Sequence, residues 1–295
     1  MALTGGGQLR VAFVGAPPWL DNCAPGWAAN GLTPSRIVHG VPPNPASVVA
    51  DVRSAHAEVT VVFDPARLPA DCLRELPGVT LGLHPRDRVD AELAEVAGAL
   101  DRVASFFPAL TGEPTGSARI WRAIPPPVSD AVYADVRRPQ TAMRAMTVGR
   151  ATDHRERMLL EAKHHHDLLQ VVHGLSGESL IELLREYDVG VYVSPWPGGA
   201  YGAQIPMHLA AGQLLLAEAP TPTHGLERNI DYLHFDSADG LAWTLDRLQR
   251  FPEMYHRIRV RGRLKAEQYR ASRVFARIAH DLLADVRAFG SPRRA

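Results

Sequence analysis

The stretch from residue 187 to residue 219 constrains the fold of this chain more than any other segment. Residues 189–193 (VGVYV) form a short apolar run rich in valine, which indicates a buried strand. The next nine residues, 194–202 (SPWPGGAYG), include two prolines and three glycines, so they predict a loop. A short helix is expected over residues 205–211, and Gly212 ends it before a second apolar strand. This order of strand, glycine-rich loop, helix and strand is typical of a parallel α/β sheet.

The glycine-rich loop is a candidate ligand-binding segment. In an open parallel sheet such a loop lies at the carboxyl ends of the strands, where these folds bind their ligands. The helix after it offers free backbone N–H groups and a partial positive charge, which suit a diphosphate. The alternative is a plain connection, because many α/β proteins have glycine-containing loops that bind nothing. The loop alone does not decide between these two interpretations.

The rest of the chain repeats the alternation of strands and helices, which predicts an α/β fold with parallel sheets covered by helices on both faces. Residues 16–31 are rich in Pro, Gly and Asn and predict a long loop. Asn44 is a candidate N-cap for a helix over residues 45–57. Strands are expected at residues 9–15, 37–40, 58–63, 79–83 and 102–107 in the first half, and at residues 145–149, 168–172, 189–193 and 214–216 in the second.

Three consecutive prolines at residues 125–127 interrupt this alternation. They stiffen the chain and do not fit a central strand, so we place the domain boundary between Pro125 and Pro139. A length of 295 residues is sufficient for two domains with separate cores. Apolar residues at helical spacing near the C-terminus predict a last helix that packs back on the first domain. They are Val274, Phe275, Ile278, Leu282 and Leu283.

Composition excludes several classes of partner. Lys plus Arg and Asp plus Glu both number 32, so no net charge attracts nucleic acid. No apolar run approaches the roughly 18 residues that a membrane span needs. The N-terminal residues lack the charged start and apolar core of a signal peptide, so we expect a cytoplasmic protein. Cys23 and Cys72 show no metal-ligand spacing and are expected to be free thiols.

Two runs of basic or imidazole side chains suggest a metal site and a nucleic-acid patch, but both are better explained as surface residues. His164, His165 and His166 are consecutive, so on a helix they point in different directions and favour a surface run over a metal site. The arginines at alternate positions from Arg257 to Arg263 also diverge on a helix. We expect them to form a solvated face, with a nucleic-acid patch as the alternative.

The second half carries a series of short motifs in a fixed order. The motifs are MTVGR at 146–150, RER at 155–157, VHG at 172–174, ELLREY at 182–187, VYVS at 191–194, HLAAGQLLL at 208–216, HGLERNID at 224–231 and HF at 234–235. As a series, these motifs resemble the C-terminal domain of GT-B glycosyltransferases, and most closely the group 1 type and the spore-maturation-protein-like branch. Residues 77–107 and 121–133 are similar to the cleft-facing and interdomain segments of those families, so the resemblance covers about residues 77–285.

The resemblance implies two Rossmann-like domains facing a cleft, with the C-terminal helix returning to the N-terminal domain. Residues 1–130 would form the acceptor-side domain, residues 139–271 the nucleotide-sugar-binding domain, and residues 272–290 the returning helix. The expected reaction is glycosyl transfer from a UDP- or GDP-linked sugar, with no further cofactor and no metal. His84 would be the catalytic candidate, touching the transferred sugar or the acceptor. The positions implied at the donor are Gly149, Arg150, Arg155, Gly198, Gly199, Ala200, Tyr201, Gly202, Met207 and His208.

The chain departs from the family pattern at two positions. Group 1 glycosyltransferases usually carry two acidic residues, eight apart, around this loop. Counting back five residues from Gly212 places Met207 at the second position, and Gly199 at the first. Neither side chain accepts hydrogen bonds from a ribose.

This departure leaves two alternatives to an active glycosyltransferase. One is a catalytically silent GT-B-like protein that binds a partner enzyme. The other is a GT-B nucleotide-sugar epimerase, for which Asp87 and Glu227 are the candidate carboxylates. The sequence identifies neither the sugar nor the acceptor, and it leaves the oligomeric state open.

Overall fold

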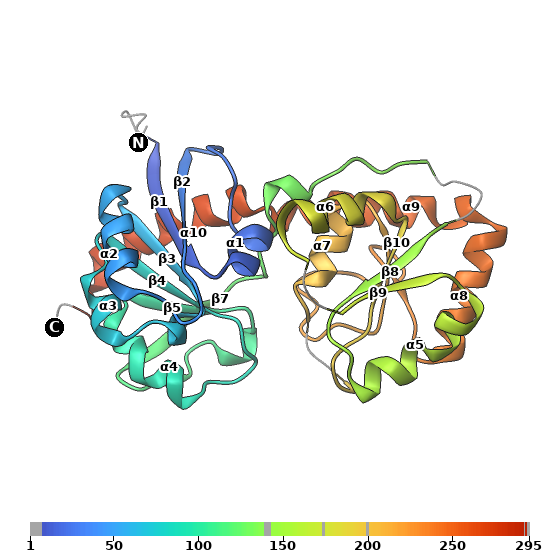
Figure 1. The fold of residues 1–295 in the computed structure, drawn as a ribbon, viewed down its shortest axis with the longest axis horizontal. Coiled ribbons are helices and arrows are strands. Elements are labelled where there is room, and N and C mark those ends of the chain that lie inside the picture. The colour runs from blue at the N-terminus through green and yellow to red at the C-terminus, as the bar shows by residue number, and fades with distance from the viewer. Residues whose placement is uncertain (1–7, 139–142, 173–174, 199–200, 292, 294–295) are drawn as a thin grey trace. The chain divides into compact units, whose positions relative to one another are not determined.

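The computed structural model describes residues 8–138, 143–172, 175–198, 201–291 and 293. The chain divides into two compact units, both mixed α/β (Figure 1). Unit 1 comprises Met1–Asp130 together with Arg270–Ala295, and unit 2 comprises Ala131–Tyr269. Strand β7 ends at Ala123 in the sheet of unit 1, and β8 begins at Ala145 in a second sheet. No sheet therefore continues across the proline-rich segment within the described residues.

Unit 1 is built on a seven-stranded sheet in the order β2-β1-β3-β4-β5-β7-β6, in which only the β6–β7 pair is antiparallel. Valine and leucine run through its central strands because both faces are covered. The strands are β1 (Leu9–Gly15), β2 (Leu32–Val38), β3 (Val59–Phe63), β4 (Val79–His84), β5 (Arg102–Ser105), β6 (Pro114–Thr115) and β7 (Ala118–Ala123).

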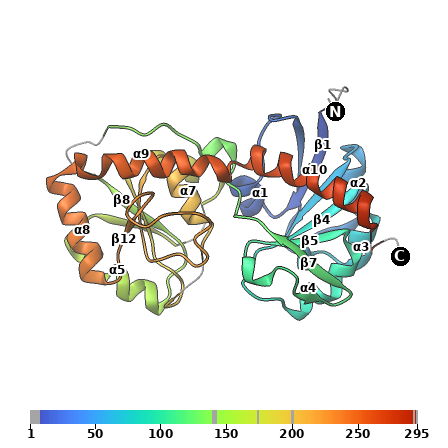
Figure 2. The ribbon, with the colours of Figure 1, turned by 180° about the vertical axis from the view of Figure 1, so that it is seen from behind.

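Helices cover the two faces of this sheet separately. Helices α2 and α3 lie on one face, and the long helix α10 crosses the other (Figures 1 and 2). The side chain of Asn44 caps α2 by accepting a hydrogen bond from the Ser47 N–H, which confirms the predicted N-cap. The helices are α1 (Pro17–Cys23), α2 (Pro45–Ser54), α3 (Ala70–Glu75), α4 (Ala91–Val96) and α10 (Ala271–Phe289), with short 3-10 turns at Pro65–Arg67, Ala97–Ala99 and Pro108–Leu110.

The last helix packs on unit 1 as predicted. Phe275 is fully buried, and its ring lies 4.7 Å from the ring of Phe13 and 6.0 Å from that of Phe63, both edge-on. The start of α10 is fixed by Asp130, whose carboxylate accepts hydrogen bonds from the Ser272 N–H and hydroxyl. A helix distant in sequence from the strands therefore completes the core of unit 1.

Unit 2 contains a five-stranded, fully parallel sheet in the order β12-β11-β10-β8-β9. Its strands are β8 (Ala145–Val148), β9 (Leu168–Val171), β10 (Val189–Tyr192), β11 (Leu214–Ala217) and β12 (Leu233–His234). Its helices are α5 (Asp153–His165), α6 (Gly177–Glu186), α7 (Gln204–Ala210), α8 (Ala238–Arg250) and α9 (His256–Lys265), with 3-10 turns at Pro252–Tyr255 and Ala266–Tyr269.

Two sequence predictions are wrong in detail. Residues 17–23 form helix α1 instead of a loop, because Pro17 and Pro18 occupy its first two positions, where no N–H donor is needed. Arg259 does not lie on a solvated face: it is 4% exposed, and its Nε donates to the Gly212 carbonyl oxygen at 2.6 Å. That bond satisfies the carbonyl at the turn between α7 and β11. Among the described residues, no helix is both long and apolar enough to cross a membrane.

We predict that Phe275→Ala lowers the free energy of unfolding by about 3–5 kcal/mol, because it removes a buried ring and leaves a cavity. Urea denaturation measures the loss. Leu283→Ala on the same helix is the control, and it should cost clearly less because Leu283 is only partly buried. Equal losses for the two variants would contradict this account of the core.

Candidate functional site

The carboxyl ends of three neighbouring strands meet at one edge of the unit 2 sheet. Strands β11, β10 and β8 are adjacent and parallel, and they are followed by Glu218, Val193 and Gly149 respectively. Helix α5 begins at the same edge, because it follows β8 after a short connection. In open parallel sheets this edge is the usual place for a ligand.

One peptide bond at this edge is held from both sides by charged side chains. Arg155 Nε donates a hydrogen bond of 2.9 Å to the carbonyl oxygen of Val193. The N–H of the same peptide, which belongs to Ser194, donates to Glu218 Oε2 at 2.7 Å. Hydrogen bonds to ionised groups are stronger than those between neutral groups. The Val193–Ser194 peptide, where the glycine-rich loop begins, is therefore fixed by a cation on one side and an anion on the other.

Arg155 also fixes the end of β8. Its Nη1 donates to the Arg150 carbonyl oxygen at 2.8 Å, and its own N–H is capped by the Thr152 hydroxyl oxygen at 3.2 Å. Gly149 is needed beneath it: its φ is +143°, and a Cβ there would lie 2.5 Å from Arg155 Nη1. Burial lowers the pKa of Arg155, while nearby Tyr192 and Glu218 act in the opposite direction. The side chain is 7% exposed.

The guanidinium of Arg155 thus donates most of its hydrogen bonds to the protein's own backbone. Two of its three nitrogens have protein partners, and Nη2 makes no hydrogen bond with any described residue. The side chain of Arg150, in contrast, is exposed and makes no hydrogen bond or ion pair with the described part of the chain. The structure places both predicted arginines at the sheet edge, with the exposed one free to meet a ligand.

The glycine-rich loop is open at one end and anchored at the other. Gly198 has a φ of +69° with open space around it, whereas Gly199 and Ala200 lie outside the described residues. Tyr201 is 4% exposed, its N–H donates to the Thr221 carbonyl oxygen at 2.9 Å, and its ring packs edge-on against His224. Tyr201 therefore anchors the loop, and neither its N–H nor its side chain is placed to contact a ligand.

Gly202 is required for close packing against β10. A Cβ at this position would lie 2.6 Å from Cε2 of Tyr192, and the residue does not have a positive φ. Burial raises the pKa of Tyr192 to about 12, with the Arg155 charge acting in the opposite direction. A larger residue at position 202 would therefore displace the buried Tyr192 ring.

Met207 and His208 are core residues of α7 with buried side chains, so a donor contact at these two positions stays a prediction. They are 5% and 0% exposed. His208 Nδ1 lies 2.5 Å from Gln213 Oε1, and Gln213 Nε2 donates to the Leu184 carbonyl oxygen. Burial lowers the pKa of His208 to about 4, although the hydrogen bond to Gln213 opposes this shift, so the ring is neutral at pH 7. Both side chains pack inside unit 2, and His208 lies against Gly190 of β10.

His84 lies in unit 1, at the end of β4. Its side chain is fully buried, and Nε2 lies 2.7 Å from the carbonyl oxygen of Arg88. Nδ1 is buried and has no hydrogen-bond partner among the described residues. The geometry offers no direct contact between this ring and a ligand, so a catalytic role for His84 stays a prediction.

Two ionisable residues at the unit 2 site, His154 and Glu218, were not expected from the sequence. Their side chains form a hydrogen bond of 2.8 Å between His154 Nε2 and Glu218 Oε1. Glu218 is the first residue after the apolar strand β11, and His154 is the second residue of the helix that carries Arg155. Their positions at the carboxyl edge were the available signal. The carboxylates named for an epimerase are both exposed, Asp87 in unit 1 and Glu227 in unit 2.

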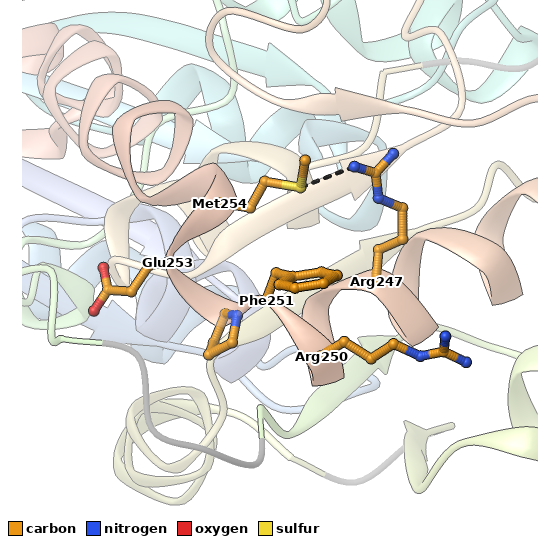
Figure 3. A pocket seen from close by; sticks show the side chains of 6 residues that line it. Arg247, Arg250, Phe251, Glu253 and Met254 are labelled. Carbon is orange, nitrogen blue, oxygen red and sulfur yellow. Dashed lines mark hydrogen bonds between the residues drawn. The ribbon is translucent and has the colours of Figure 1, made fainter.

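Two other features of the described residues do not add to this site. No group of three or more His, Cys, Asp or Glu side chains there is arranged to hold a metal ion. A surface hollow lies at the end of α8, lined by Arg247, Arg250, Phe251, Pro252, Glu253 and Met254 (Figure 3). Gln249 beside it donates to the carbonyl oxygen of Met143, which precedes β8. The hollow is therefore near the amino edge of the sheet, opposite the candidate site.

Comparison with known proteins identifies the fold. No family model matches the chain, and no curated protein matches it. Among solved structures it is similar to sucrose-phosphate synthase from Thermosynechococcus elongatus, with 12% identity and a TM-score of 0.62 over 95% of this chain and 99% of that one. HepE from Anabaena, in complex with UDP-glucose, has 10% identity and a TM-score of 0.57, over 94% and 100%. A glycosyltransferase from Rickettsia africae has 11% identity and a TM-score of 0.55, over 96% and 99%.

These similarities confirm the predicted fold class: an α/β chain of two Rossmann-like units with the GT-B architecture. At such low identities they establish the fold and not the reaction.

We predict that Arg155→Met destabilises unit 2 by about 3 kcal/mol, because it leaves Glu218 and the Val193 carbonyl without their cation. The midpoint of urea denaturation measures this loss. Arg157→Met is the matched control on the same helix, since Arg157 is exposed, and it should change stability by less than about 0.5 kcal/mol. Matching midpoints for the two variants would show that Arg155 does not hold the site together.

Proposed function

We propose that unit 2 binds a nucleoside diphosphate sugar, UDP- or GDP-linked, at the carboxyl edge of its sheet, and that the chain transfers the sugar to an acceptor. The observation that carries the proposal is the Val193–Ser194 peptide clamped between Arg155 and Glu218, with the exposed Arg150 beside it. The HepE structure with UDP-glucose supports this choice of ligand, because that protein has the same fold. The group 1 and spore-maturation-like branch remains our proposal for the finer family.

Arg150 is the residue that we assign to the donor phosphates. Its guanidinium is exposed at the end of β8 and makes no hydrogen bond or ion pair with a described residue, while its carbonyl oxygen is fixed by Arg155. A guanidinium presents a planar fork of N–H donors that matches phosphate oxygens. Arg155 then has two roles: it fixes the backbone of Arg150, and its buried guanidinium adds positive charge at the same sheet edge.

The loop that starts at Ser194 supplies the second part of the proposed donor site. Gly198 has a backbone conformation that side chains resist, and the space around it is open, so a phosphate or sugar can approach its backbone closely. Tyr201 fixes the far end of the loop through its buried ring. Since Met207 is buried, we do not assign the ribose to an acidic pair at the usual positions.

The chemistry needs no covalent intermediate and no metal in this proposal. The bond between the anomeric carbon and the β-phosphate oxygen breaks with its electron pair on that oxygen, an acceptor oxygen bonds to the carbon, and the acceptor's proton passes to water. Negative charge then accumulates on the departing nucleoside diphosphate. Fixed cations near this group stabilise the transition state more than the ground state. In unit 2, Arg150 and Arg155 would provide that stabilisation.

The alternative is a catalytically silent GT-B-like protein that supports another enzyme. The specific observation in its favour is the buried, apolar Met207 at the position where the resemblance to group 1 glycosyltransferases implies an acidic residue. An assay of free UDP or GDP released from nucleotide sugars, with candidate acceptors present, separates the two functions. Binding without release in any combination would favour the silent protein.

We predict that a thermal-shift screen of UDP, GDP, ADP and their glucose conjugates shows stabilisation by UDP or GDP compounds, because a ligand stabilises the state to which it binds.

Arg150→Ala should weaken binding of the effective nucleotide about 10-fold in calorimetry, which corresponds to about 1.4 kcal/mol for a lost charged hydrogen bond. Arg157→Ala is the control and should bind as the wild type does. Stabilisation by none of the compounds would contradict the proposed function.

A further inference from the structure

The His154–Glu218 pair has no part in the donor contacts proposed so far. His154 Nε2 lies 2.8 Å from Glu218 Oε1, and the two side chains are 11% and 18% exposed. Both therefore reach solvent at the sheet edge while being held by each other. The other carboxylate oxygen of Glu218 is occupied by the Ser194 N–H, so the carboxylate cannot turn away from His154 without releasing the loop.

The charges at this edge are poorly balanced for an anionic ligand. Arg155 and Glu218 hold the same peptide, and the negative charge of Glu218 offsets part of the positive charge of Arg155. Arg150 adds one positive charge, and Asp153 in the first turn of α5 adds one negative charge near the edge. A second histidine, His234, ends the neighbouring strand β12, where its Nδ1 lies 3.2 Å from the Ala217 carbonyl oxygen. Tyr192 of β10 is neutral, since burial raises its pKa to about 12. The diphosphate of a nucleotide sugar carries two negative charges, so the site needs a further cation.

We propose that His154 is that cation: in its imidazolium form it is a donor-binding residue of unit 2, and Glu218 positions its ring. The hydrogen bond to Glu218 fixes which ring nitrogen faces the carboxylate. Protonation of the other ring nitrogen converts the hydrogen bond into an ion pair with Glu218. The Glu218 carboxylate then offsets less of the positive charge that Arg155 presents to the ligand. The inference rests on the proposed function and adds to it the group that selects for an anionic diphosphate.

The sign of the pH dependence follows from this assignment. An anion binds more tightly to the protein that carries the imidazolium than to the protein with a neutral ring, so the affinity rises as pH falls. Histidine is the side chain that ordinarily changes its charge between pH 5 and 8. One added charge a few ångströms from a diphosphate, in an environment of intermediate dielectric constant, is worth on the order of a tenfold change in affinity.

The test is calorimetric titration of the full-length protein with UDP-glucose and GDP-glucose at pH 6, 7 and 8 and constant ionic strength. Nucleotide sugars are the correct probes because both of their phosphates are esterified and do not titrate in this range. We expect about tenfold tighter binding at pH 6 than at pH 8. His154→Gln should bind at every pH with about the wild-type affinity at pH 8.

His165→Gln is the matched control. His165 lies on the same helix and also pairs with a glutamate, Glu161 at 3.4 Å, but it is exposed at the other end of α5. This variant should keep the wild-type pH profile. A wild-type affinity that does not change with pH, or a profile that survives in His154→Gln, would overturn the inference and leave the proposed function in place. Absence of binding at every pH would overturn both.

Discussion

The candidate site depends on one peptide bond. Between Val193 and Ser194 the chain leaves strand β10 and enters the glycine-rich loop, and both polar groups of that peptide are bound by charged side chains. Arg155 comes from the helix after β8, and Glu218 from the end of β11, so three segments of the sheet edge are tied together. The same arginine holds the Arg150 carbonyl. Arg155 and Glu218 together therefore fix the start of the glycine-rich loop, and Arg155 also fixes the backbone of Arg150.

The chain carries glycine and methionine, at positions 199 and 207, where the resemblance implies an acidic pair. Position 207 is occupied by methionine because α7 is buried almost throughout, with His208 bonded to Gln213 inside the core. Among the described residues, Glu218 is the carboxylate that accepts a hydrogen bond from the Val193–Ser194 peptide, and it directly follows the neighbouring strand β11. In our proposal the acidic residue of the site is Glu218, which follows β11. It holds the Ser194 N–H at the start of the loop and the ring of His154.

Much of the fold was predictable because it depends on patterns that are local in sequence. The strands β8 to β11, the Asn44 cap and the amphipathic spacing of the last helix all follow from short-range periodicity. The site was predictable only in part. Gly149 and Arg150 lie in one motif and Arg155 opens the next, but the pairing of Glu218 with His154 joins residues 64 positions apart. Burial of Tyr201, Met207 and His208 likewise depends on tertiary packing that no local pattern records.

A crystal structure of the protein with UDP tests the central claim most directly, since it locates the diphosphate relative to the clamped peptide. We predict diphosphate density at the carboxyl edge of the unit 2 sheet, within hydrogen-bonding distance of the Arg150 guanidinium, with the Val193–Ser194 peptide still bound by Arg155 and Glu218. A nucleotide bound instead in the hollow near Phe251, or one that binds only after Arg155 has left the Val193 carbonyl, would contradict the account.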